Sequence, residues 1–401
     1  MKYLDCLLMN NETKNKIMPK LRFPEFLHKG DWEEKQLSEV LDYERPDNYI
    51  VSDTNYLKSG TPVLTANKSF ILGYTSEQHG IYEDVPAIIF DDFTVDKKYV
   101  DFPFKVKSSA IKILKPKEKN NLKFFFELMS QLKFEAKEHK RYYISTYQNL
   151  FVQVPKPSEQ QKIADCLSSF DDFITAENQK LEALKAHKKG LMQQLFPVEG
   201  ESVPRLRFEE FRNGGEWEYD ALCGNDIAFF VNEKIPLEEL ELKSYVSTEN
   251  LLSNYGGKTT SSKLPSSGSA TRFKIKDILL SNIRPYLKKV WLANIDGGAS
   301  NDVIVIRADS KLEASFLSLL LINDDFINYI MKGAEGVKMP RGDKDLIKLY
   351  RISFPKKAEQ QKIASCLSSL DELITAQAEK IEGLQNHQKG LMQVLFPNIN
   401  E

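Results

Sequence analysis

The sequence contains the same segment twice. Residues 155–197 align without gaps on residues 355–397, and 28 of the 43 positions are identical at an offset of 200. A second match pairs Leu21-Arg22-Phe23 with Leu206-Arg207-Phe208 at an offset of 185. The stretch between the matched segments is therefore 15 residues longer in the second copy, since 200 − 185 = 15, and it shows no convincing identity. Such a chain is expected to form two related units with retained flanks and different middles.

Each repeated segment is expected to form one long helix. Positions 163, 167, 170, 174, 177, 181, 184, 188, 191 and 195 are separated by alternating steps of four and three, and eight of these ten are apolar. Glu177 and Lys188 are the exceptions, and Gln377 and Gln388 take the equivalent positions in the second copy. A period of 3.5 residues is typical of a coiled-coil seam. Packing of each helix on its own unit alone is the simpler alternative, but so narrow a seam favours a helical partner.

The two seams are natural partners for each other. An antiparallel pairing would relate the two globular sections by a pseudo-twofold axis. Ser158 with Gln161 predicts a capping box at the start of the first helix. We predict an α+β fold in which two mixed α/β domains are joined by two long helices that pair as an antiparallel coiled coil. The expected parts are an N-terminal tail (1–18), a first variable domain (19–157), a first helix (158–197), a second variable domain (204–357) and a second helix (358–397).

The two variable middles follow the same predicted order of elements. Period-two and continuous apolar runs predict strands, and longer amphipathic stretches predict helices. In the first middle the strands are expected at 86–90, 110–114 and 150–154, around a helix from 123 to about 137. In the second they are expected at 278–283, 303–307 and 350–354, around a helix from about 312 to 331. The middles are thus expected to share a fold while their surfaces differ.

Positive charge is concentrated in two parts of a chain whose net charge is only −2. Residues 97–147 hold 13 Lys/Arg against 5 Asp/Glu, and residues 258–293 hold 8 against 1. Aromatic and amide side chains lie among these charges, a mixture that suits phosphates and base edges. For any single lysine a solvated basic surface is the simpler explanation, but two islands at equivalent places favour binding. The candidate DNA-binding residues are Asn67, Lys68, Tyr74, Lys97, Lys98, Tyr99, Arg141, Tyr142, Tyr143, Lys258, Arg272, Arg284, Tyr286, Lys288, Lys289, Lys338 and Arg341.

The sequence offers no persuasive catalytic, metal or cofactor motif. It lacks the Asn-Pro-Pro-Tyr type of tetrapeptide of amino-methyl transfer and the GxGxxG loop of dinucleotide sites. Gly256-Gly257-Lys258-Thr259 resembles the end of a P-loop, but Leu252 occupies the place of its first glycine. Asp91-Asp92 has no partners at metal-ligand spacing, and the four cysteines are isolated. We therefore expect a chain without catalytic residues, metal or bound cofactor, and a cytoplasmic one, since no signal peptide or long apolar run is evident.

Several motifs resemble those of one protein family. Glu159-Gln160-Gln161-Lys162-Ile163-Ala164 and its second copy at 359–364 begin the helices, and Gly-Leu-Met-Gln closes them at 190–193 and 390–393. Together with the segments at 278–285 and 338–342, these motifs are similar to those of specificity subunits of type I restriction-modification systems, over nearly the whole chain.

That resemblance implies a function and a set of partners. Each variable domain would be a target recognition domain that reads one half of a bipartite, asymmetric site in double-stranded DNA. The paired helices would hold the two domains at a set distance and dock two modification subunits. Those subunits would carry S-adenosylmethionine and methylate adenine, and two restriction subunits can join to cleave DNA. The chain itself would be a non-catalytic subunit without a membrane partner.

Helix length agrees with such a spacing role. A helix of about 38 residues at 1.5 Å per residue is roughly 57 Å long, which corresponds to at most one to two turns of DNA. A duplicated coiled-coil adaptor, whose variable domains bind protein or glycan, is the alternative from another functional class. The basic islands argue against it. The bases of the target do not follow from sequence pattern, because readout depends on side-chain geometry and DNA shape.

Overall fold

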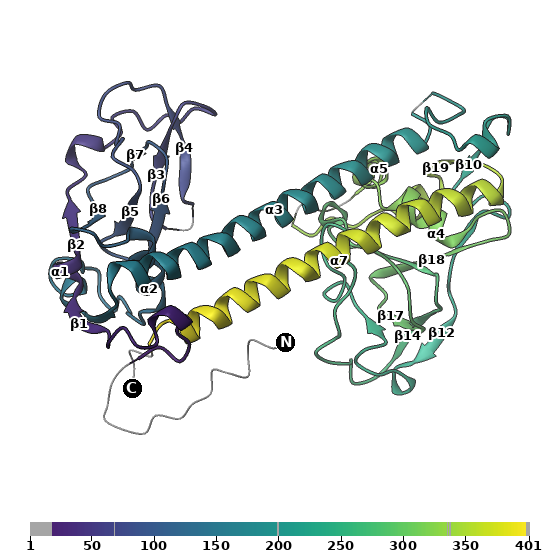
Figure 1. Cartoon of the computed structure of the whole chain (residues 1–401). Coiled ribbons are helices and arrows are strands. Elements are labelled where there is room, and N and C mark those ends of the chain that lie inside the picture. The colour runs from purple at the N-terminus through teal and green to yellow at the C-terminus, as the bar shows by residue number, and fades with distance from the viewer. Residues whose placement is uncertain (1–17, 68, 199, 335, 337, 398–401) are drawn as a thin grey trace. The chain divides into compact units, whose positions relative to one another are not determined.

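The computed structural model describes residues 18–67, 69–198, 200–334, 336 and 338–397 (Figure 1). Its contacts divide the chain into two units. Unit 1 comprises Met1–Gln179 and Ala378–Glu401, and unit 2 comprises Lys180–Gln377. Each unit therefore contains the first part of one long helix and the last part of the other.

The two long helices are α3 (Pro157–Leu195) and α7 (Lys357–Leu395), each 39 residues long. All ten seam positions of each helix are buried or half-buried, while most of the positions between them are exposed. The 3.5-residue period is thus confirmed. Even the polar exceptions Glu177 and Gln377 are buried, at 8% and 6% exposure. Glu177 accepts a hydrogen bond from Lys380 Nζ at 2.6 Å, so a charged partner compensates its burial.

The predicted capping box at Ser158 is wrong. The helix begins one residue earlier, at Pro157, and Ser158 lies inside its first turn. Proline suits the first helical position because its fixed φ matches the helix and its missing N–H would have no partner there. The Gln161 side chain donates instead to Asp165 Oδ1, at 2.6 Å.

Within each unit the two helices run antiparallel. In unit 1, Gln388 Nε2 donates to Asp171 Oδ1 at 2.7 Å, and the Glu177–Lys380 pair lies further along α3 and further back along α7. In unit 2, Lys188 Nζ donates to both carboxylate oxygens of Asp371, at 2.5 and 2.7 Å. The Asp371–Lys188 pair lies at the positions equivalent to Asp171 and Gln388, with the two helices exchanged and an offset of 200. The long helices therefore pair with each other and do not pack only on their own domains.

A four-stranded antiparallel sheet forms the centre of unit 1. Its order is β2 (Leu41–Glu44), β8 (Ile111–Pro116), β5 (Ala87–Asp91) and β6 (Lys97–Val100). A second sheet has the order β4 (Ile71–Thr75), β3 (Thr61–Leu64) and β7 (Lys105–Val106). Strands β1 (Glu33–Gln36) and β9 (Phe151–Val154) form a separate antiparallel pair. Short α1 (Leu37–Val40) and α2 (Leu122–Gln131) complete the unit.

Strand β5 is buried on both faces. Ile88 and Phe90 join a core that includes α2 and both long helices, whereas Ala87 and Ile89 join a second core with strands β3 and β7. Alternate residues of a strand point to opposite faces, so one strand serves two cores. The end of β5 is consequently held in a fixed place.

Unit 2 repeats this architecture. Its central sheet has the order β11 (Ala228–Phe230), β18 (Val303–Ala308), β15 (Ile278–Ser281) and β16 (Val290–Leu292). A second sheet contains β12 (Lys234–Pro236), β14 (Ser269–Phe273), β17 (Gly297–Ala299) and β13 (Tyr245–Val246), and β10 (Glu218–Ala221) pairs with β19 (Arg351–Phe354). The helices are α4 (Ala314–Leu321), α5 (Asp324–Lys332) and α6 (Lys344–Lys348). Strand β15 again divides its side chains between two cores. The expectation that the unlike middles share a fold is confirmed.

Two helices differ from their predicted extent. Helix α2 ends at Gln131, because Leu132 is extended and Phe134 packs edge-on against Tyr142 and Tyr147, at 5.4 and 5.3 Å between ring centroids. The single helix expected over 312–331 is two helices, α4 and α5. The Asn323 side chain caps α5 by accepting from the backbone N–H two residues later, at 3.0 Å.

A buried ion pair joins each retained N-terminal motif to its long helix. Arg22 donates through Nε and Nη2 to the two carboxylate oxygens of Glu159, at 2.7 Å each, and Trp32 Nε1 donates to the same carboxylate at 3.2 Å. Arg207 and Glu359 form the equivalent bidentate pair in unit 2, at 2.8 and 2.7 Å. We call these the arginine–glutamate clamps.

The glutamine that follows each clamp glutamate ties the helix start to two further segments. Gln160 donates to Pro155 O and to Asn120 Oδ1, at 2.9 and 3.1 Å, and accepts from Asn121 N at 2.8 Å. Gln360 makes the matching bonds to Pro355 O, Lys311 O and Glu313 N. The Glu-Gln-Gln motif is therefore explained by structure: it fixes the helix to its own domain.

Replacing Arg22 with methionine should destabilise the chain, because the Glu159 carboxylate would stay buried and, within the described part of the chain, would keep only the Trp32 N–H as a donor. Side-chain exposure of the pair is 9% and 2%. Breaking such a pair from one side costs about 3 kcal/mol of unfolding free energy. Urea unfolding followed by tryptophan fluorescence measures the change. Lys185→Ala, which breaks an exposed pair with Glu182, is the matched control and should cost less than about 0.5 kcal/mol. Equal losses in the two variants would contradict a stabilising clamp.

Candidate nucleic-acid interface

The predicted DNA-binding residues fall into three groups by exposure. Lys68 lies outside the described residues. The exposed residues are Asn67, Arg141, Arg284, Tyr286, Lys338 and Arg341. The half-buried residues are Tyr74, Lys97, Lys98, Tyr99, Lys258, Arg272, Lys288 and Lys289. Tyr142 and Tyr143 are buried.

Tyr142 and Tyr143, two of the predicted DNA-binding residues, are not at the surface. Their exposed fractions are 4% and 1%. The Tyr142 hydroxyl donates to Glu138 O at 2.9 Å, and the Tyr143 ring packs against Phe90 and Tyr43. Burial raises the pKa of the Tyr143 phenol. These rings support the loop from inside, which leaves their neighbour Arg141 on the surface.

Most of the half-buried cations already have partners within their own unit. Burial lowers the pKa of Lys97 and of Lys258, which indicates ammonium groups partly withdrawn from water. Their partners and those of the other cations are aromatic rings, carbonyl oxygens and carboxylates: Tyr147 for Lys97, Lys243 O and the Trp291 ring for Lys258, Asp324 for Lys288, Thr248 O for Lys289, and Glu233 and Glu239 for Arg272. The exposed arginines are better placed to meet a ligand.

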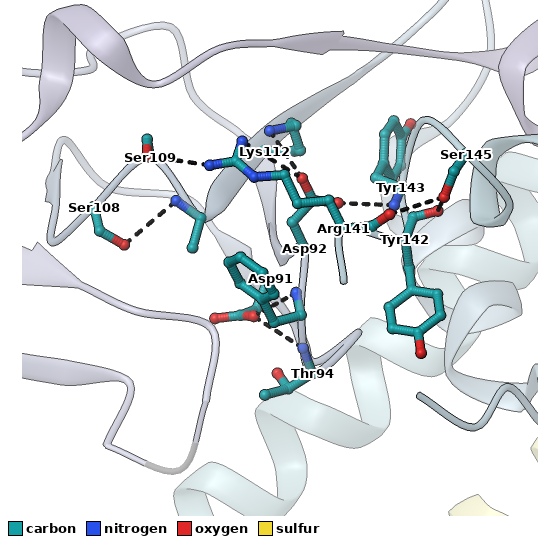
Figure 2. A network of polar contacts seen from close by, with 12 residues as sticks. Asp91, Asp92, Thr94, Ser108, Ser109, Lys112, Arg141, Tyr142, Tyr143 and Ser145 are labelled. Carbon is teal, nitrogen blue, oxygen red and sulfur yellow. Dashed lines mark hydrogen bonds and ion pairs between the residues drawn. The ribbon is translucent and has the colours of Figure 1, made fainter. Parts of the chain in front are cut away.

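In unit 1, Asp92 directly follows strand β5 and joins its own segment to two others, near Ala110 and near Tyr142 (Figure 2). The Asp92 N–H donates to Ala110 O, and Asp92 O accepts from Tyr142 N, both at 2.8 Å. Its carboxylate accepts from Tyr143 N at 2.8 Å and lies 3.1 Å from Lys112 Nζ. Asp92 and Lys112 are nearly inaccessible, at 1% and 2% exposure. Asp92 thus fixes the loop that presents Arg141.

Arg141 extends from this loop into solvent, with 53% of its side chain exposed. Its Nη1 lies 4.0 Å from Asp92 Oδ2, its Nη2 donates to Ser109 Oγ at 3.4 Å, and its guanidinium lies 5.7 Å from the Phe93 ring centroid. The same side chain lines a hollow whose other charged residues are Arg45, Asp47, Asp92 and Lys112. Three cations and two carboxylates give the hollow a net positive charge.

Unit 2 has the same backbone arrangement after strand β15. The Asn282 N–H donates to Asp302 O at 2.8 Å, and Asn282 O accepts from Gly342 N at 3.1 Å. These bonds match those of Asp92, so Arg341, just before Gly342, takes the place that Arg141 takes before Tyr142. Arg341 has 60% of its side chain exposed, and its Nη1 lies 3.0 Å from Asp302 Oδ1.

Arg284 lies beside Arg341. The Arg284 N–H donates to Pro340 O at 2.8 Å, and Ile283 and Arg341 form an antiparallel bridge. Arg284 adopts a left-handed backbone conformation, with φ at 51°, just before the short turn Pro285–Leu287, which carries the exposed Tyr286. The two segments singled out in the sequence, 278–285 and 338–342, are therefore brought together at one surface.

Sequence reasoning missed the acidic residues that hold these arginines. In the sequence, Asp91-Asp92 shows only that it lacks metal-ligand spacing, and no pattern singles out Asp302. A signal for the arginines themselves was present: Arg141 lies 14 residues before Pro155, as Arg341 lies before Pro355. Among the described residues, no group of three or more His, Cys, Asp and Glu side chains could hold a metal ion, and none of the described helices could cross a membrane.

Comparison with known sequences gives consistent matches. The profile described as Type I restriction modification DNA specificity domain matches residues 29–186 and 225–386. The chain is 29% identical to the Type I restriction enzyme EcoR124I/EcoR124II specificity subunit of Escherichia coli over 375 residues, which cover 86% of this chain and 87% of that protein. It is 23% identical to the Type I restriction enzyme MjaVIII specificity subunit of Methanocaldococcus jannaschii, over 96% of this chain and 95% of that protein.

Solved structures share the fold. A crystal structure of a type I restriction-modification system S subunit from M. genitalium has a TM-score of 0.60 and 16% identity, covering 95% of this chain and 99% of that one. A chain from a structural study of complex assembly and conformational transition of the type I R-M system has a TM-score of 0.54 and 15% identity, covering 92% and 98%. At these identities the likeness concerns the fold.

Substituting Asp92 with alanine should loosen the segment 138–147. The Tyr143 amide loses its acceptor, and Lys112 is left buried without a counter-charge. Hydrogen exchange of a peptide covering this segment, followed by mass spectrometry, should become roughly tenfold faster. Asp91→Ala is the matched control, because among the residues that the structure describes the Asp91 carboxylate bonds only to the turn amides of Phe93 and Thr94. Equal exchange in the two variants would refute the anchoring role of Asp92.

Proposed function

Because the chain belongs to the type I restriction-modification DNA specificity family, we propose that it reads a bipartite, asymmetric DNA site, with one half-site for each unit. The observation that carries this proposal is the contrast between the two copies. The units share one architecture, yet the surface loops beside β5 and β15 differ in sequence and present exposed arginines. Two readers of one fold with different surfaces suit two different half-sites. The relatives named above are specificity subunits, and none of them is an adaptor.

The outer faces of the long helices support a shared partner. Off the seam, the last parts of α3 and α7 keep the same exposed side chains at several positions: Glu182, Lys189 and Gln193, with their equivalents at 382, 389 and 393. The seam does not explain these residues. We propose that each copy docks one modification subunit through this face.

The proposed partners supply the chemistry. The modification subunits would bind S-adenosylmethionine and methylate adenine, and two restriction subunits could join to cleave DNA. This chain would contribute recognition and spacing and would act in the cytoplasm, where the DNA is. Its cations would then serve phosphates and base edges, and none would act as an acid or base.

Expression of this chain with its modification partner should produce methylated adenines at one bipartite motif. Two defined half-sites separated by a constant number of unspecified base pairs are expected, because two rigid readers contact separate stretches of DNA. Long-read sequencing of the host genome detects the modified bases. The partner expressed without this chain is the control. A motif that is unchanged when this chain is absent would refute the proposed function.

Shortening both helices by one heptad should shorten the spacer and leave both half-sites unchanged. Residues 179–185 of α3 lie between the contacts of Glu177 and Lys188, and residues 372–378 of α7 lie between those of Asp371 and Lys380. Removing seven residues preserves the seam and shortens each helix by about 10 Å, which is roughly three base pairs.

The matched control removes four residues from α3 alone, which displaces the seam and should abolish modification. An unchanged spacer in the heptad variant would contradict the spacing role of the helices.

A further inference from the structure

We propose that Arg141 and Arg341 are equivalent specificity-determining residues, and that each donates to a guanine edge in the half-site of its own unit. The inference rests on the proposed function and names the residues and the base that it involves. Asp302 is the positioning residue for Arg341, and Asp92 and Ser109 position Arg141.

The backbone establishes the equivalence. In each unit the residue after the central strand donates to the carbonyl just before the neighbouring strand, through Asp92 to Ala110 and through Asn282 to Asp302. The carbonyl of the same residue accepts from the amide that follows the arginine. Around this frame the side chains differ, since Tyr142 follows one arginine and Gly342 the other. The arginine is thus common to both units while its neighbours differ, which suits two domains that recognise different DNA sequences.

The acidic neighbour of Arg341 favours a base over a phosphate as its ligand. For Arg141 the same ligand is inferred from its equivalent place on the backbone. Phosphate binding depends on net positive charge, and the pair of Arg341 and Asp302 carries none. A carboxylate 3.0 Å from the guanidinium also repels a nearby phosphate. The hydrogen-bond donors remain, because arginine has five N–H groups and Asp302 engages one nitrogen. Neutral acceptor pairs match this arrangement, and guanine O6 and N7 are the pair that arginine contacts most often.

Each guanidinium is also held from one side before DNA arrives. Asp302 fixes Nη1 of Arg341, and Ser109 with the Phe93 ring fixes the guanidinium of Arg141. The exposed remainder of each side chain is directed at solvent. Restraint of a long side chain reduces the entropy lost on binding, which improves discrimination between bases.

Arg141→Ala and Arg341→Ala, each in the complex with the modification partner, test the proposal. The wild-type motif is mapped first, and binding is then measured to the wild-type duplex and to duplexes with single G·C to A·T changes, at several salt concentrations. Each variant should lose roughly 10- to 100-fold of discrimination at one G·C pair of one half-site, with the other half-site read normally. The two variants should affect opposite half-sites.

Three further variants sharpen the result. Arg341→Lys should also lose the discrimination, because an ammonium group cannot make the paired contact. Asp302→Asn should weaken discrimination while it strengthens binding to unrelated DNA, since it removes a negative charge. Arg205→Ala is the control, because it removes an exposed arginine that is likewise paired with a carboxylate, that of Glu201. It should change neither the discrimination between bases nor the binding to unrelated DNA.

Results that would overturn the proposal can be told apart from failure of the proposed function. An equal loss of affinity on all duplexes with a smaller salt slope would identify phosphate contacts and overturn the proposal, as would unchanged discrimination. Should an alanine variant lose both half-sites, the lysine variant decides: retained discrimination with lysine overturns the proposal. Failure of the proposed function appears separately, as a wild-type complex that modifies no bipartite motif.

Discussion

The arginine–glutamate clamps are the constraint on which both units depend. Each clamp joins the segment that enters a domain to the first turn of the helix that leaves it, across 137 residues in unit 1 and 152 in unit 2. A charge pair buried this deeply is unfavourable unless both partners are present and well oriented. Entry and exit of each variable domain are therefore held together regardless of what lies between them. This separation explains how the middles can differ so widely in sequence on an unchanged frame.

The central strands extend that frame to the surface. Because β5 and β15 are buried on both faces, their ends are fixed by two cores each. The loops beyond them share the same backbone hydrogen bonds in the two units, whereas the side chains that support them differ. Arg141 and Arg341 are thus held by rigid strands, although they lie in loops whose sequence can vary. Binding sites on rigid scaffolds with variable loops combine positional precision with varied specificity.

Sequence reasoning succeeded where one physical periodicity dominates. The helices and their pairing followed from the apolar seam, the shared fold followed from the common order of strands, and the family resemblance read from the motifs was confirmed. It failed where burial depends on distant partners. Tyr142 and Tyr143 lie in a basic run of the sequence and yet are buried beneath it. The DNA-contacting roles of the cations remain predictions, since no sequence pattern fixes which of them already has an internal partner.

The division of the chain has a consequence for its synthesis. Unit 2 is one continuous stretch, Lys180–Gln377, whereas unit 1 needs both ends of the chain. Leu395 and Phe396 fill the core of unit 1 beside Phe124. Since a nascent chain leaves the ribosome from its N-terminus, this core must wait for residues made more than two hundred positions later. The unit that begins to emerge first is therefore the one that is completed last, and its apolar surface stays open in the meantime.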